Sequence, residues 1–130
     1  MDPARLKKIP VFADLNDEEL GHIAALAAEV SVPESKELVR EGDYSYDVLA
    51  IEEGTARVDR HGDHLADLGP GDVFGEMGVL QREQRNATVV ATSPMLLVTL
   101  TSWDIRRLQK TAPNAVAHLR DVVAQRSDQA

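Results

Sequence analysis

The chain has 130 residues, and its hydrophobic content of 43% is enough for one domain with one modest core. Its formal net charge of −8 and its pI near 4.9 exclude the basic face that a sequence-independent grip on nucleic acid needs, so we expect no nucleic-acid partner. The lack of cysteine excludes disulfides and thiolate chemistry, and the lack of a signal peptide or a bilayer-length apolar run predicts a soluble, cytoplasmic chain with no membrane contact.

The first element expected along the chain is a helix that begins at Asn16. The Asn16 side chain can accept a hydrogen bond from the helix backbone while Glu19 reaches back to the Asn16 amide, which is a capping box. Apolar residues then recur three and four positions apart from Leu20 to Val30, so one stripe is predicted to face a core. Pro33 is expected to end this helix, which makes residues 1–35 an N-terminal helical segment.

Between residues 36 and 100 the pattern changes to short apolar or alternating runs, which predicts strands. The expected strands cover residues 37–40, 47–51, 55–59, 64–68, 87–92 and 95–100. Turn signals rich in glycine, proline and aspartate separate them, among them Glu53-Gly54 and Gly69-Pro70-Gly71-Asp72. Many short strands with such turns favour a jelly roll, in which two sheets each bury one face.

Helical spacing returns after residue 100. Thr101 and Asp104 can form a second capping box, and Ile105 and Leu108 fall on one side of the helix that follows. Trp103, in the first turn, is expected to be a packing anchor. Pro113 separates this helix from a last one, whose predicted apolar face consists of Val116, Leu119, Val122 and Val123.

These elements predict one domain over residues 1–130 that is mainly β with flanking helices. It is expected to comprise an N-terminal helix, a double-stranded β-helix (jelly roll) at residues 36–100, and two C-terminal helices at residues 101–126.

The stretch from Gly71 to Ala91 carries the chemistry. Residues 75–80 can form one short helical turn whose unpaired amides attract an anion, and Gly75 and Gly78 let a ligand approach the backbone closely. Arg85 offers a fork of donors that matches two phosphate oxygens. Glu76 would repel a phosphate, so its natural task is to accept a hydrogen bond from a ribose hydroxyl. Together these groups describe a nucleotide whose phosphate and ribose lie close together.

These residues resemble the cyclic nucleotide-binding domains of kinase regulatory subunits, gated channels and bacterial catabolite-activator-like regulators. The resemblance spans nearly the whole chain. Its most specific part is the phosphate-binding cassette at residues 74–89, in which Glu76 and Arg85 are nine positions apart. The cassette reads Phe74-Gly75-Glu76-Met77-Gly78-Val79-Leu80 and Arg85-Asn86-Ala87-Thr88-Val89. Flanking matches are Arg40-Glu41-Gly42-Asp43, Glu53-Gly54 and Leu68-Gly69-Pro70-Gly71-Asp72-Val73.

The resemblance implies a role for each cassette residue. It implies that a cyclic phosphate is held at Gly75, Met77, Gly78, Arg85, Asn86 and Ala87. It places Glu76 on the ribose 2′-hydroxyl and Val58 near the base. It also implies that the C-terminal helix folds over the base as a lid, with Leu119, Val122 and Val123 as candidate contacts.

Two positions depart from the family pattern. Asn86 stands where many members carry Ala, Ser or Thr, and a Thr there resembles domains that prefer cyclic GMP; the asparagine gives no clean base preference, and cyclic AMP is favoured over cyclic GMP. Gly78 stands where many members carry Ala, which is harmless if only its amide acts.

The resemblance implies a regulatory sensor that catalyses nothing, with no cofactor beyond the nucleotide. Its ligand is expected to shift the C-terminal helices between two packings. The sequence carries neither the helix-turn-helix of the regulator members nor the membrane spans of the channel members. The chain is therefore expected to act on a protein partner, as a subunit of an assembly, or as an excised piece.

Two rival interpretations stay open. The first keeps the roll but has it bind another protein, nucleotide binding having been lost; Asn86 and the missing output domain motivate it. The second is a cupin-like metal enzyme, for which the candidate ligands are His22, His61, His64 and His118. Because His61 and His64 flank a Gly-Asp turn, they are expected at a solvated hairpin tip, and no metal site is predicted.

Overall fold

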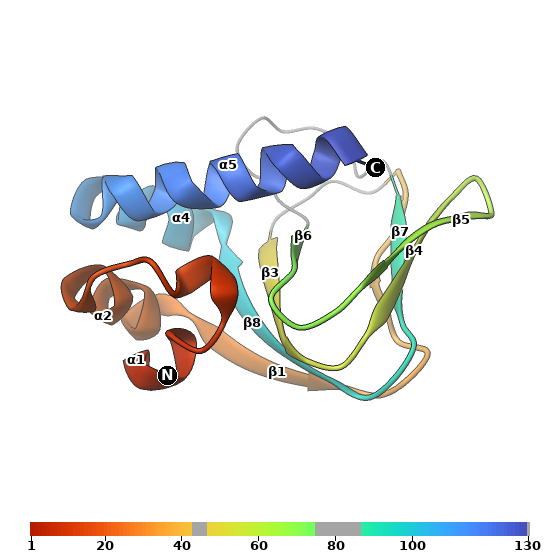
Figure 1. The fold of residues 1–130 in the computed structure, drawn as a ribbon, viewed down its shortest axis with the longest axis horizontal. Helices are drawn as coiled ribbons and strands as arrows, with labels where there is room; N and C mark the ends of the chain where they lie inside the picture. Colours follow the sequence, from red (N-terminus) through yellow and green to blue (C-terminus); the bar gives the residue numbers. More distant parts are fainter. Residues whose placement is uncertain (43–46, 75–86, 130) are drawn as a thin grey trace.

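Two antiparallel four-stranded sheets form the centre of the molecule, and helices cover one end and one side of them (Figure 1). The computed structural model describes residues 1–42, 47–74 and 87–129. One sheet has the strand order β1-β8-β3-β6 and the other has the order β2-β7-β4-β5. The strands are β1 Ala28–Val32, β2 Glu37–Val39, β3 Asp47–Glu53, β4 Ala56–Arg60, β5 Asp63–Leu68, β6 Val73–Phe74, β7 Thr88–Ala91 and β8 Met95–Thr101. The predicted class, mainly β with a jelly roll and flanking helices, is confirmed.

The N-terminal region contains three short helices, α1 Pro3–Leu6, the 3-10 helix η1 Pro10–Phe12, and α2 Asp17–Leu26. The capping box predicted for α2 is present. The Glu19 amide donates to Asn16 Oδ1 at 2.8 Å, and the Asn16 amide donates to Glu19 Oε1 at 3.1 Å. Leu20 and Ile23 on α2 are buried, as the apolar stripe requires.

The predicted helix is too long at its C-terminal end. α2 stops at Leu26, Ala27 is extended with φ −68° and ψ 142°, and residues 28–32 form β1, which pairs with β8. The run Ala-Glu-Val-Ser-Val fits both a helical spacing and a strand alternation, and such short windows are decided by pairing partners elsewhere in the chain. The helical reading placed Val30 in a core, whereas its side chain is 37% exposed on the edge strand β1.

Strand alternation divides the buried side chains into two clusters on opposite faces of the β1-β8-β3-β6 sheet. Val48 and Ala50 of β3 face the helices, while Leu49 and Ile51 of the same strand face the other sheet. The helical cluster joins one sheet face to α1, α2 and the C-terminal helices. The inter-sheet cluster fills the roll and consists of Leu49, Ile51, Ala56, Val58, Leu68, Phe74, Ala87, Val89, Ala91, Met95 and Leu97.

All six predicted strands are present within one or two residues of their expected ends, and β1 and β6 were not predicted. β4 and β5 form a hairpin whose turn has positive φ at His61 (53°) and Gly62 (83°), the geometry of a tight turn that matches strand twist. The side chains of His61 and His64 are 79% and 52% exposed, which confirms the predicted solvated hairpin tip.

The C-terminal helices are α4 Ser102–Thr111 and α5 Pro113–Gln129. The capping box of α4 is confirmed, because the Asp104 amide donates to Thr101 Oγ1 and the Thr101 amide donates to Asp104 Oδ2. α5 continues to residue 129, three residues beyond the predicted end. The prediction that Trp103 anchors packing is wrong, because its side chain is 69% exposed while Ile105 and Leu108 form the buried face of α4.

Candidate ligand site at one end of the roll

The predicted cassette joins the two sheets. It begins on β6, where Phe74 is paired with Leu49 of β3, and it ends on β7, where Thr88 is paired with Asp59 of β4. β3 and β4 belong to different sheets, so the described ends of the cassette lie on opposite walls of the roll. Gly75, Glu76, Met77, Gly78, Arg85 and Asn86 lie outside the described residues, so their roles stay predictions.

Apolar burial fixes both ends of the cassette. Phe74, Ala87 and Val89 are at most 7% exposed and belong to the inter-sheet cluster, and Val73 is fully buried in the helical cluster. Because the Ala87 side chain packs inside the roll, only the backbone of Ala87 could contact a phosphate. Both described ends of the cassette are therefore anchored in the packed interior of the molecule.

The turn before β6 is set by backbone hydrogen bonds and by glycine. The Gly71 amide donates to Ile51 O at 2.8 Å, and the Ile51 amide donates to Asp72 O at 2.9 Å, which docks the turn on β3. Gly71 has φ +94°, and a Cβ there would come within 2.9 Å of Pro10 Cγ on η1. The glycine of the matched Gly69-Pro70-Gly71-Asp72 sequence thus serves both the turn and the contact with the N-terminal region.

Sequence reasoning missed a polar link beside the far end of the cassette. The Glu41 amide donates to Thr88 Oγ1 at 2.9 Å, and the Glu41 carboxylate accepts the His61 amide at 2.9 Å. The His61 ring nitrogen Nδ1 lies 3.1 Å from the second Glu41 oxygen. Glu41 therefore ties the residues after β2 to the start of β7 and to the β4–β5 turn. The sequence showed Glu41 only as part of a matched motif, because nothing local signals contacts 20 and 47 residues away.

The predicted base-facing residues lie in different clusters. Val58 on β4 is 8% exposed, is paired with Val89 of β7, and belongs to the inter-sheet cluster. Leu119 on α5 is 4% exposed and belongs to the helical cluster. The Val122 side chain lies outside the described residues. The structure therefore brings Val58 beside the start of β7, and it packs Leu119 among the helices.

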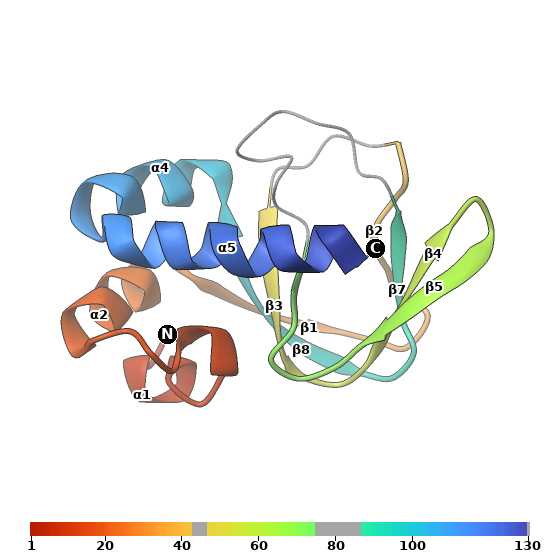
Figure 2. The same cartoon turned by 45° about the horizontal axis from the view of Figure 1, so that its top comes forward.

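α5 passes over the end of the roll at which β6 ends and β7 begins, as both views show (Figures 1 and 2). The helix contacts β6 directly. Among the helices of residues 1–42, 47–74 and 87–129, α5 is the one that passes over this end of the roll.

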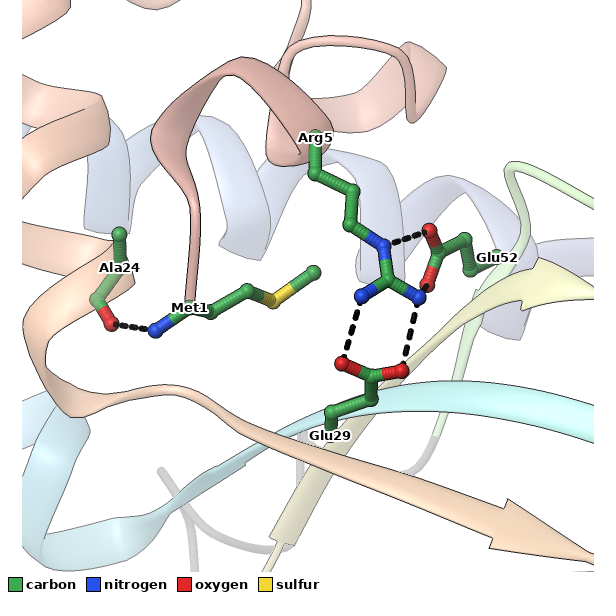
Figure 3. Close-up of polar contacts among 5 residues, drawn as sticks. All are labelled: Met1, Arg5, Ala24, Glu29 and Glu52. Carbon is green, nitrogen blue, oxygen red and sulfur yellow. Dashed lines mark hydrogen bonds and ion pairs between the residues drawn. The ribbon is translucent and has the colours of Figure 1, made fainter.

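A second polar cluster, which the sequence analysis did not predict, joins the N-terminal region to the roll (Figure 3). The Arg5 guanidinium donates to both carboxylate oxygens of Glu29 on β1 at 2.7 Å, and to both of Glu52 on β3 at 2.6 and 3.1 Å. The hydrogen bonds that Arg5 donates to Glu29 and, second in size, to Glu52 raise the pKa of Arg5 above its ordinary value. Two carboxylates already use the hydrogen-bond donors of the guanidinium. Arg5 therefore links α1 to β1 and β3 and is not a candidate for binding an anionic ligand.

Within residues 1–42, 47–74 and 87–129, no group of three or more His, Asp or Glu side chains is arranged to hold a metal ion. No helix in that part of the chain has the length and apolar character needed to cross a bilayer.

The sequence model of the cyclic nucleotide-binding domain matches residues 29–112, a span that takes in both sheets, the whole cassette and α4. The chain belongs to the cyclic nucleotide-binding domain family.

Individual relatives agree with this assignment. A cyclic nucleotide-gated potassium channel of Rhizobium etli is 29% identical over 118 residues, which cover 91% of this chain and 33% of the channel. A cyclic AMP receptor protein of Thermus thermophilus is 32% identical over 123 residues, which cover 88% of this chain and 57% of the receptor. The chain thus spans between about a third and little more than half of these two curated relatives.

Solved structures share the fold over almost the whole chain. The crystal structure of Thermus thermophilus catabolite activator protein superposes with a TM-score of 0.81 at 29% identity and covers 92% of this chain and 59% of that one. The similar proteins include kinase regulatory subunits, a receptor protein and channels, and the family is regulatory, not catalytic.

Proposed function

We propose that this chain is a cyclic nucleotide sensor that favours cyclic AMP over cyclic GMP, catalyses nothing itself, and passes the binding signal to its C-terminal helices. The single observation that carries the proposal is the family match over residues 29–112, because that span contains the complete cassette together with both strands that anchor it.

The proposed phosphate site consists of the Arg85 guanidinium and the backbone amides around Gly75, Met77, Gly78, Asn86 and Ala87. A bidentate guanidinium and several aimed amides are the donor set that a doubly esterified phosphate requires, and they suit a chain whose overall charge is −8, since a small anion needs only a local positive site. Glu76 is the proposed acceptor for the ribose 2′-hydroxyl. The buried ends of β6 and β7 support this assignment by fixing the cassette on both walls of the roll.

The proposed base contact from the roll is Val58. Its position beside Val89, one residue after the start of β7, supports a place close to the end of the cassette. Leu119 and Val122 are the proposed contacts from α5. Because Leu119 is packed in the helical cluster, its contact with a base requires α5 to shift, and this requirement connects binding to the helices.

Two observations support the choice of nucleotide and the coupling. The Thermus thermophilus relative is named a cyclic AMP receptor protein, and a relative from Yarrowia lipolytica is a cAMP-dependent protein kinase regulatory subunit. α5 contacts β6, the strand that leads into the cassette, and this contact supports a coupling between the cassette and that helix. We further propose that the output is read in the cytoplasm by a protein partner or another subunit.

The test is a pair of calorimetric titrations of the whole chain, one with cyclic AMP and one with cyclic GMP. We expect saturable binding of both, with the lower dissociation constant for cyclic AMP. Tighter binding of cyclic GMP would reverse the base choice and leave the sensor function intact. Absence of heat and of a thermal shift with either nucleotide at millimolar concentration would overturn the proposal and favour a roll that binds only protein.

A further inference from the structure

The most exposed large apolar side chain among the described residues is Trp103, at 69%. It lies in the first turn of α4, and the Arg106 guanidinium carbon stacks over its ring 5.1 Å from the centroid. Tryptophan and arginine are among the residues enriched at the energetic centres of protein interfaces, and a side chain already held in place loses little conformational freedom on binding.

Trp103 is part of a continuous stripe along α4. Arg106, Arg107 and Lys110 are three, four and seven positions further on and are also exposed, so all four side chains fall within about 100° of arc over about 10 Å of helix. We call these four residues the α4 stripe. Within the part of the chain that the structure describes, no ion pair reaches any of its three cations.

The stripe is presented rigidly. Ile105 and Leu108, on the opposite side of α4, are 3% and 0% exposed and lock the helix into the helical cluster. The capping box at Thr101 fixes its first turn. A docking partner would therefore lose little binding free energy to ordering of the α4 helix.

The charge of the α4 stripe and its single exposed aromatic side chain indicate which kind of partner it binds. An interfacial membrane helix inserts an apolar face into the bilayer, but the apolar face of α4 is already buried in the protein. Three cations are also far fewer than a nucleic-acid footprint contains. A short basic patch around one aromatic anchor instead complements carboxylates that flank an apolar side chain.

We propose that the α4 stripe docks an acidic segment of a partner protein, with Trp103 covered by an apolar side chain of that segment and the cations paired with its carboxylates. The stripe lies outside the cassette, so this inference stands or fails independently of nucleotide binding.

Trp103 is the only tryptophan of the chain, so intrinsic fluorescence reports on the stripe alone. The probe is a short synthetic helical peptide of glutamate and leucine with the leucines at helical spacing; a second peptide has every glutamate replaced by glutamine. We expect the acidic peptide to shift the emission to the blue with saturation, and added salt to weaken its affinity. The uncharged peptide should bind at least about tenfold more weakly.

Two variants with equal charge change locate the binding surface. The double variant Arg106→Glu/Arg107→Glu should weaken acidic-peptide binding by about tenfold or more, whereas Lys7→Glu/Lys8→Glu, which alters two exposed lysines next to α1, should change it by less than about threefold. Trp103→Ala, measured by calorimetry, should also weaken binding. Cyclic nucleotide affinity should be unchanged in all three variants, and a thermal melt of each confirms that it is folded.

Any of five results would overturn the proposal, and the first four concern selectivity. They are equal binding of both peptides, equal losses in the two charge variants, an emission shift with phosphatidylserine vesicles but not with the acidic peptide, and an emission shift that follows protein concentration alone, which would identify a second copy as the occupant. No response to the acidic peptide at millimolar concentration would overturn it as well.

Discussion

The inter-sheet cluster and the helical cluster share the β1-β8-β3-β6 sheet but use opposite faces of it. The residues of the inter-sheet cluster lie mostly on strands, and the hydrogen bonds between neighbouring strands fix the positions of those strands. The helical cluster is closed by helices, and of these α5 contacts β6 at the end of the roll. Helices attached to a sheet by apolar packing alone can shift as bodies, while a hydrogen-bonded strand pair cannot. The comparison supports the proposal that the cassette and Val58 contact the ligand from the inter-sheet side, while α5 on the helical side carries the signal.

The largest expected effect is on the helical side. Leu108 is fully buried in the helical cluster, so Leu108→Ala should lower the free energy of unfolding by about 3 kcal/mol, through lost burial and a cavity. Chemical denaturation followed by circular dichroism measures the change. The matched variant is Leu65→Ala. The Leu65 side chain is 40% exposed on β5, so this substitution should lower the free energy of unfolding by less than about 1 kcal/mol. Equal costs for the two would show that the helical cluster is not a packed core.

The next largest effect is on the affinity for the nucleotide, and it involves no change in the packed core. Arg85→Ala should weaken cyclic nucleotide binding by about 2 kcal/mol or more, roughly thirtyfold, because a charge-assisted bidentate contact is lost. Calorimetry measures the dissociation constant, and a melt of the ligand-free variant is the control. Glu76→Gln should weaken binding less, because an amide oxygen still accepts from the ribose hydroxyl. An unchanged dissociation constant for Arg85→Ala would remove Arg85 from the site.

Val58→Ala sharpens the comparison by testing whether the inter-sheet side serves both stability and binding. The loss of two buried methyl groups should lower the free energy of unfolding by about 1.5 kcal/mol, and it should also raise the dissociation constant for the nucleotide. Denaturation and calorimetry on the same sample report the two quantities. Val30→Ala, on the exposed edge strand β1, should change neither by more than about 0.5 kcal/mol. If Val58→Ala affects stability alone, Val58 does not face the base.

The smallest effect is confined to the helical side. Asn16→Ala removes the side-chain acceptor for the Glu19 amide and should lower the free energy of unfolding by about 1 kcal/mol. Nucleotide affinity should stay the same, because α2 lies on the helical face of the shared sheet. Asn16→Ser, which keeps an oxygen acceptor at the cap, should recover most of the loss in a thermal melt. A matching loss of nucleotide affinity would mean that the two sides are not separable in this way.

The accuracy of the sequence-based predictions depended on the range of the interactions involved. Both capping boxes connect residues three positions apart and were predicted correctly. β1 was taken for helix because its five residues fit two periodicities, and its pairing with β8, about 70 residues further on, decided between them. Trp103 was misplaced because it was judged by its size and hydrophobicity, although it precedes Ile105 by two positions and therefore lies on the side of α4 opposite to the buried Ile105.

The sequence by itself determined the local elements other than β1 and β6, the alternation that divides the buried side chains between two faces of a sheet, and the order of residues in the cassette that points to a cyclic nucleotide. These features follow from spacing over a few residues, and a linear sequence records such spacing fully. Only the tertiary structure decided that Arg5 is occupied by Glu29 and Glu52, that Glu41 holds the start of β7, and that Leu119 packs among the helices. Each of these contacts joins residues distant in sequence, and their meeting depends on how the whole chain packs.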